Sequence, residues 1–236
     1  MFDAAVSAGV VRIRRPNARW LSTGWNGGFH DTAVAYNVSV PEGWDRTDLG
    51  RYVNERRRRA DFPKPGPALL TGVDLEHLRG ARMGPVEVYA TAGLSNPAAL
   101  PMAPTEPDGR DDSTGAASDT GPGTVNLIVG TDRALDDGAL ASLVAVAVEA
   151  KAATLLARTG FPGTTTDAVI AGTDPDGDPA AFAGSATPIG GAARACVREA
   201  VMASLQSRYA EEPMPNTVAE ASYGLSTDQR AEVFRP

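Results

Sequence analysis

Cysteine is almost absent from this chain, which has one, Cys196, among its 236 residues. A single thiol cannot form an internal disulfide, and it supplies no cysteine-based metal site. We interpret Cys196 as a small buried packing residue. The scarcity of cysteine predicts a reducing compartment and therefore a cytoplasmic protein.

Histidine and lysine are also scarce: the histidines are His30 and His77, and the lysines are Lys64 and Lys151. The histidines form no H-E-x-x-H or H-x-H pattern, which disfavours a metallohydrolase. Neither lysine follows a glycine-rich run, so the phosphate-binding P-loop is missing. The dinucleotide fingerprint G-x-G-x-x-G after a strand and the hydrolase elbow G-x-S-x-G are missing too. We therefore expect neither a metal nor a cofactor.

Positive charge and long apolar runs are lacking as well. The net charge of -7 and the pI near 4.9 leave no basic excess to neutralise phosphates, which argues against nucleic-acid binding. The best membrane-span candidate, Gly138 to Ala157, contains Glu149 and Lys151, so we expect no span. An early Asp3 and the lack of a basic region before an apolar run predict that no signal peptide is present. Few lysines and many aspartates resemble the composition of halophilic cytosolic proteins.

The sequence does contain enough apolar residues, 42%, for a substantial core. Apolar and alternating runs predict strands at Val10 to Arg14, Ala18 to Thr23, Thr32 to Val40, Ala68 to Val73, Val86 to Ala92, Thr124 to Thr131, Ala168 to Ala171 and Ala181 to Ala186. Helices are predicted at Trp44 to Ala60, Gly138 to Arg158 and Gly190 to Tyr209. We expect an α+β or mixed α/β fold, one domain over residues 1–236, in which the two long helices cover a central mixed sheet of about six to nine strands.

Several polar segments are interpreted as surface. Residues 102–122 are rich in Pro, Asp, Gly, Ser and Thr and predict a mobile acidic loop. The tail from Glu211 is predicted to be loose. The run Arg56 to Arg59 is interpreted as a solvated helix end, with an anionic-ligand patch as the alternative. Asp174 to Asp178 is interpreted as a hairpin turn rather than a calcium loop.

The stretch from Thr159 to Gly172 joins the long apolar helix to a buried strand. Its polar residues include three adjacent threonines, Thr164 to Thr166, and one carboxylate, Asp167. Polar side chains so close to a buried strand indicate a turn that faces a cavity. The alternative is an ordinary loop, because Asp and Thr are common in turns and helix caps.

Further polar loops lie at predicted strand ends: Ser22 to Asp31, Thr91 to Asn96 and Ser185 to Thr187. If the topology brings them to Asp167, they form a pocket of hydroxyls, amides and one or two carboxylates. Such a pocket suits hydrolysis of an amide or ester by a base-activated water or hydroxyl. Glu149, on the buried helix, either pairs with an arginine or reaches this pocket. Asn37 lies on a strand face that is either polar or lines the site.

Several motifs together resemble the adenosylcobinamide amidohydrolase family of archaea and some bacteria. They are W-L-S-T-G-W-N-G-G at Trp20 to Gly28, A-V-A-Y-N-V at Ala33 to Val38, Y-A-T-A-G-L-S-N-P at Tyr89 to Pro97, T-V-N-L-I-V at Thr124 to Val129, E-A-K at Glu149 to Lys151, T-T-T-D-A-V at Thr164 to Val169 and G-S-A-T at Gly184 to Thr187. The resemblance covers roughly Arg12 to Ser207. Phe161 and Pro162 depart from the family's more regular Gly/Thr alternation, and residues 102–122 resemble an insertion.

The resemblance implies a corrinoid-salvage enzyme that hydrolyses the aminopropanol amide of adenosylcobinamide, with the cobalt corrinoid as substrate. Asp167 would activate water or a neighbouring threonine, and His30 is the second candidate base. Thr165 or Thr166 would be the nucleophile or an oxyanion donor. The substrate-binding candidates are Ser22, Thr23, Trp25, Asn26, Phe29, Asn37, Ser95, Asn96, Glu149, Thr164 and Ser185. The alternative is a corrinoid-binding module without turnover, and whether the chain forms a homo-oligomer stays open.

Overall fold

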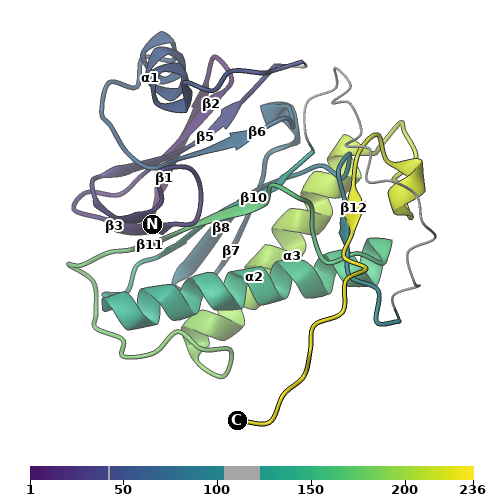
Figure 1. Cartoon of the computed structure of the whole chain (residues 1–236). Helices are drawn as coiled ribbons and strands as arrows, with labels where there is room; N and C mark the ends of the chain where they lie inside the picture. The colour runs from purple at the N-terminus through teal and green to yellow at the C-terminus, as the bar shows by residue number, and fades with distance from the viewer. Residues whose placement is uncertain (42, 104–122) are drawn as a thin grey trace.

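The computed structural model describes residues 1–41, 43–103 and 123–236. Most of the predicted acidic loop, residues 104–122, lies outside the described residues. The described chain folds into two main sheets with three α-helices around them (Figure 1).

A six-stranded mixed sheet lies at the centre, in the order β4-β3-β11-β10-β8-β7. Its strands are β3 (Arg19–Ser22), β4 (Gly28–Asp31), β7 (Arg79–Met83), β8 (Val86–Ala92), β10 (Val125–Thr131) and β11 (Ala168–Thr173). The β10–β11 pair is parallel, and the other pairs are antiparallel. Helix α2 (Asp137–Thr159) connects these two parallel strands. Because the strands are parallel neighbours, the segments that precede them meet at the same edge of the sheet.

A four-stranded sheet, in the order β1-β2-β5-β6, packs against the first. Its strands are β1 (Asp3–Ser7), β2 (Val10–Arg14), β5 (Val34–Ser39) and β6 (Ala68–Thr71). Helix α1 (Leu49–Arg59) joins the parallel strands β5 and β6, and the 3-10 turn η1 (Leu75–His77) follows β6. Helix α1 begins later than the predicted Trp44, after Asp48, whose side chain makes no capping hydrogen bond.

Helices α2 and α3 (Pro188–Arg208) lie on one face of the large sheet (Figure 1). Local sequence explains their ends. The Asp136 carboxylate accepts from the Ala139 N–H at 2.7 Å to begin α2, and Gly160 ends it in the left-handed region at φ 82°. The predicted mixed α/β fold with two long helices is confirmed. The sheet was expected to be single, whereas a second sheet covers its other face.

Strand alternation explains the layers. On β10, Leu127 and Val129 point toward the helices, whereas Ile128 points toward the small sheet. Asn126 lies on the same face of β10 as Ile128, and its side chain forms hydrogen bonds with residues of the small sheet. Apolar side chains around the fully buried Trp20 fill the space between the sheets. Since a third apolar cluster joins the small sheet to α1, the order of layers is α2 and α3, large sheet, small sheet, α1.

Helix α2 is long and apolar enough to cross a membrane by length and composition. Half of its most apolar window is buried inside the protein, however, as in the core helix of a soluble protein. The neighbouring Cys196 of α3 is 2% exposed and faces the same core, as predicted.

Candidate active site

A cavity of about 360 Å³ lies where the starts of β10 and β11 meet β6. Trp25, Trp44 and the residues of β6 form much of its wall, and Thr124, Thr166 and Asp167 contribute polar groups. Its volume falls within the range of small-molecule sites, which combine an apolar wall with a few polar groups.

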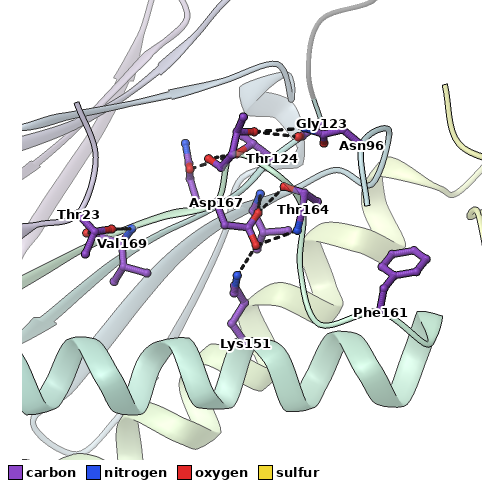
Figure 2. A network of polar contacts seen from close by, with 12 residues as sticks. Thr23, Asn96, Gly123, Thr124, Lys151, Phe161, Thr164, Asp167 and Val169 are labelled. Carbon is purple, nitrogen blue, oxygen red and sulfur yellow. Dashed lines mark hydrogen bonds and ion pairs between the residues drawn. The ribbon is translucent and has the colours of Figure 1, made fainter. Parts of the chain in front are cut away.

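The carboxylate of Asp167 accepts four hydrogen bonds in this wall (Figure 2). Its Oδ1 accepts from the Val125 backbone N–H at 2.8 Å and from the Thr164 hydroxyl at 2.5 Å. Its Oδ2 accepts from the Thr164 backbone N–H at 3.0 Å and pairs with the Lys151 ammonium. These bonds fix the turn before β11 to the start of β10 and to helix α2.

Lys151 was not among the predicted site residues. The side chains of Lys151 and Asp167 are 8% and 11% exposed, so each charge has lost most of its water and depends on the other. Gly163 leaves room for the pair, because a Cβ there would lie 2.5 Å from Asp167 Oδ2 and 3.0 Å from Lys151 Nζ. A lysine within an apolar helix, in a chain whose other basic residues are nearly all arginine, was the sequence signal for it.

Asn96, which follows β8, holds the same turn from the other side. Its backbone oxygen accepts from the Thr165 N–H at 3.1 Å, and its Nδ2 donates to Thr165 Oγ1 at 2.7 Å. The Thr166 hydroxyl donates to the Gly123 backbone oxygen at 3.3 Å, and the Thr124 hydroxyl donates to the Thr166 oxygen at 2.9 Å. The predicted polar loops after β8 and before β11 are thus brought together.

A buried polar chain lies behind the cavity, between the two sheets. Asn37 is 2% exposed, donates to Thr91 Oγ1 at 2.9 Å and accepts from Asn126 Nδ2 at 3.1 Å. Asn126 Nδ2 also donates to the backbone oxygen of Leu70, a cavity residue, at 2.7 Å. Asn37 therefore supports the cavity wall from behind and does not line it.

Comparison with known proteins identifies the family. Residues 4–213 match the family model described as adenosylcobinamide amidohydrolase. The chain is 56% identical to the adenosylcobinamide amidohydrolase of Halobacterium salinarum, and the alignment covers 100% of both chains. The chain belongs to the adenosylcobinamide amidohydrolase family. A second member, from Methanosarcina mazei, is 28% identical over 80% of this chain and 90% of that protein.

The resemblance stated from the sequence motifs is thereby confirmed. Among solved structures, a crystal structure of a protein from Pyrococcus horikoshii OT3 has a TM-score of 0.43 and 14% sequence identity, over 86% of this chain and 78% of that chain. A similarity at that level carries no argument about the amidohydrolase site.

Two predicted residues of the amidohydrolase, Phe29 and His30, lie on the edge strand β4, away from the cavity. His30 is paired with Trp20 of β3, so β3 separates it from β11. Phe29 is 44% exposed and has the Arg19 guanidinium 4.9 Å from its ring centroid. Within the described residues, no group of three or more His, Cys, Asp or Glu side chains is arranged to hold a metal ion.

Two further predicted residues, Glu149 and Ser185, are also away from the cavity of the amidohydrolase. The Glu149 side chain is 60% exposed on α2 and pairs with Arg194 of α3, which is the first of the two alternatives given for it. Ser185 is exposed in the loop after β11, at the opposite edge of the sheet from the turn that precedes β11.

Residues of the loop after β3 either line the cavity or shape the loop around it. Thr23 lines the cavity, and its Oγ1 accepts from the Val169 N–H at 2.9 Å. The buried Ser22 accepts from the Gly24 N–H at 3.2 Å and so shapes the loop that carries Trp25. Asn26 lies in the turn itself, where its backbone has φ 51°. Its side chain is exposed and is not part of the cavity wall.

Tyr209 ties the end of α3 to the segment that carries Ser95 and Asn96. Its oxygen accepts from the Leu94 N–H at 2.8 Å, and burial raises the pKa of Tyr209, so the hydroxyl stays protonated at neutral pH. We expect Tyr209→Phe to destabilise the protein by about 1–2 kcal/mol, because the buried Leu94 N–H loses its acceptor. Urea unfolding measures this. An unchanged midpoint would show that water replaces the hydroxyl.

Proposed function

We propose that the cavity beside Asp167 is the active site at which this chain hydrolyses the aminopropanol amide of adenosylcobinamide. Family membership makes the chain an adenosylcobinamide amidohydrolase of cobinamide salvage. The products are adenosylcobyric acid and 1-amino-2-propanol. The observation that carries the site assignment is that Asp167, which is buried in an ion pair with Lys151, lines a cavity together with hydroxyls and tryptophans.

Asp167 acts as the base. The Thr164 hydroxyl can leave Oδ1 by rotation about its own side-chain bond, and this rotation frees one acceptor position on Oδ1 while the Val125 N–H stays bonded. A water molecule in the cavity then gives its proton to Oδ1 as its oxygen attacks the amide carbon. When the C–N bond breaks, the proton passes to the leaving nitrogen. The amide and water become an acid and an amine, and Asp167 returns to its starting state.

The remaining polar groups position the reactants. Lys151 holds Oδ2, so that only Oδ1 is available to the water. Of the two threonine candidates, Thr166 lines the cavity, and its hydroxyl turns from the Gly123 backbone oxygen to donate to the amide oxygen as negative charge develops there. Thr165, held by Asn96, fixes the position of Thr166. Thr166 as the nucleophile is the alternative, with an ester intermediate that water then cleaves.

The corrin macrocycle with its amide arms is too large for a cavity of about 360 Å³, so the cavity receives the aminopropanol arm. The macrocycle lies outside, against Trp25, whose side chain is 46% exposed. A second cavity of about 490 Å³ shares Val40 and Gly72 with the first and provides space for further amide arms.

Trp25→Ala tests this placement. We expect the KM for adenosylcobinamide to rise about tenfold with little change in kcat, since a flat apolar contact outside the reacting centre is lost. Phe29→Ala is the matched control, because Phe29 is a similarly exposed aromatic on β4, away from the cavity. Equal effects of the two substitutions would contradict the placement of the macrocycle.

Incubation of the purified chain with adenosylcobinamide, followed by mass spectrometry, tests the proposed reaction. We expect equal amounts of adenosylcobyric acid and 1-amino-2-propanol. Tight binding without release of aminopropanol would instead support the alternative, a corrinoid-binding module without turnover.

The proposed setting is the cytoplasm, with one domain that acts on a small-molecule corrinoid. The single cysteine and the acidic composition support this setting, and the net charge of -7 gives no basis for a nucleic-acid partner. The cobalt belongs to the substrate, and the proposed steps use only side chains of this chain and water.

A further inference from the structure

The C-terminal segment, expected from sequence to be loose, contains a short strand beside the active site. Strand β12 (Leu225–Ser226) pairs in parallel with β9 (Ala98–Ala99) (Figure 1). The N–H groups of Tyr223, Leu225 and Thr227 donate to the backbone oxygens of Ser95, Pro97 and Ala99 at 2.8, 2.9 and 3.0 Å. Strand β12 lies beyond residues 4–213, which match the family model.

The segment from Ser95 to Ala99 uses its other side for the active-site turn. The Ala98 N–H donates to the Gly163 oxygen at 2.9 Å, and the Asn96 oxygen accepts from the Thr165 N–H at 3.1 Å. Alternation of the backbone therefore directs residues 95, 97 and 99 toward β12 and residues 96 and 98 toward the turn. The segment is a middle strand between β12 and the turn that leads to Asp167.

The active-site turn has little tolerance for movement. The missing side chain of Gly163 is what allows the backbone to lie against Asp167 and Lys151, as the 2.5 Å and 3.0 Å distances from a Cβ indicate. Asn96 also bonds Thr165 through its side chain, so a shift of the middle strand displaces the hydroxyls of the turn. Misplacement of reacting groups by about 1 Å costs as much as about 100-fold in rate.

Glycine is also required where β12 approaches the middle strand. Gly224 has φ 150°, and a Cβ there would lie 2.8 Å from the Pro97 oxygen and 3.0 Å from Val218 Cγ1. Pro97 has no N–H, so its oxygen is its one backbone hydrogen-bonding group, and that group is bonded to Leu225.

We infer that β12 is a positioning element of the amidohydrolase: through the Ser95 to Ala99 segment it holds the Gly163 to Asp167 turn in its catalytic conformation. The inference rests on the proposed active site. It assigns to residues 223–227 a role in turnover, although none of them lines the cavity.

Leu225→Pro tests the inference in the full chain, because proline removes the N–H that donates to Pro97 and pushes β12 from the middle strand. Ser226→Pro is the matched control: in a parallel ladder alternate residues bond the neighbour, so the Ser226 N–H points away from β9. We expect kcat to fall about tenfold in Leu225→Pro with a small change in KM, and both to be unchanged in Ser226→Pro.

Amide hydrogen exchange separates the inference from the proposed function. Faster exchange in residues 163–167 of Leu225→Pro, with α2 and β10 unchanged and with reduced kcat, supports both. Unchanged exchange in residues 163–167 overturns the positioning role, whatever the activity. Faster exchange there with unchanged kcat means that β12 does hold the turn but that the turn is not catalytic, which overturns the proposed active site instead.

Discussion

Asp167→Asn is expected to lower kcat for adenosylcobinamide by at least about 100-fold, the typical contribution of a general base. The amide has the size of the carboxylate but carries no charge, so it can neither take a proton from water nor pair with Lys151. The substitution also replaces one acceptor oxygen with an NH₂ donor. The groups around this side chain are donors, so the NH₂ group cannot accept their hydrogen bonds. Turnover measured as release of 1-amino-2-propanol gives the result.

The same strand provides the control. Asp167 directly precedes β11, and Asp174 directly follows it. Asp174 is 2% exposed and pairs with Arg15. Asp174→Asn breaks the ion pair of another buried carboxylate, with an arginine that is 29% exposed, at the opposite edge of the sheet, so stability should fall while kcat stays near the wild-type value. Unchanged turnover in a folded Asp167→Asn variant, or equal losses in the two variants, would remove Asp167 from the mechanism.

Lys151→Met is expected to have the largest effect on stability, a loss of about 3 kcal/mol, because it leaves the Asp167 carboxylate buried without its countercharge. For a chain of this size, a loss of that magnitude lowers the unfolding midpoint by about 10 °C. Methionine keeps the length and apolar stem of lysine, so the helix packing is retained. Thermal unfolding and turnover are measured on the same preparation.

Lys64→Met is the control for loss of a lysine, since Lys64 is exposed and should tolerate the change. The double variant of Lys151→Met and Asp167→Asn completes a thermodynamic cycle. Because the uncompensated charge is removed in it, the double variant should be more stable than Lys151→Met alone. Additive losses would mean that the two side chains do not interact in solution.

Local signals were strong enough to predict much of the framework. The strand at Thr32 to Val40 and the helix at Gly138 to Arg158 were predicted from alternation and apolar content, and the structure has β5 and α2 there. The turn that holds Asp167 was singled out because polar residues adjoin a buried strand. These features depend on neighbours in sequence, which is why sequence patterns reveal them.

The predicted strand at Ala181 to Ala186 was wrong. A returning strand needs a free edge beside β11, but β10 and β3 occupy its two sides. The chain instead crosses to α3 as a loop in which Ala183 is buried and Phe182 is 75% exposed. Small apolar residues in this stretch fit a strand and a loop equally well, so the decision depends on pairing at long range.

Long-range pairing also explains what was missed at the site. Lys151 and Asp167 lie sixteen residues apart, on either side of a helix end, and only the packing of α2 on the sheet brings them into contact. His30, by contrast, was proposed from residue type, and its place on the edge strand β4 follows from a pairing with β3 that the composition of its loop does not reveal.

A crystal structure of the Asp167→Asn variant with adenosylcobinamide bound tests the proposed active site, because slow turnover preserves the substrate. We expect the aminopropanol amide in the cavity of about 360 Å³, with its oxygen within hydrogen-bonding distance of the Thr166 hydroxyl and the macrocycle against Trp25. An aminopropanol amide bound beside His30 and Phe29, or in the second cavity of about 490 Å³, which Arg56 lines, would contradict the proposed active site.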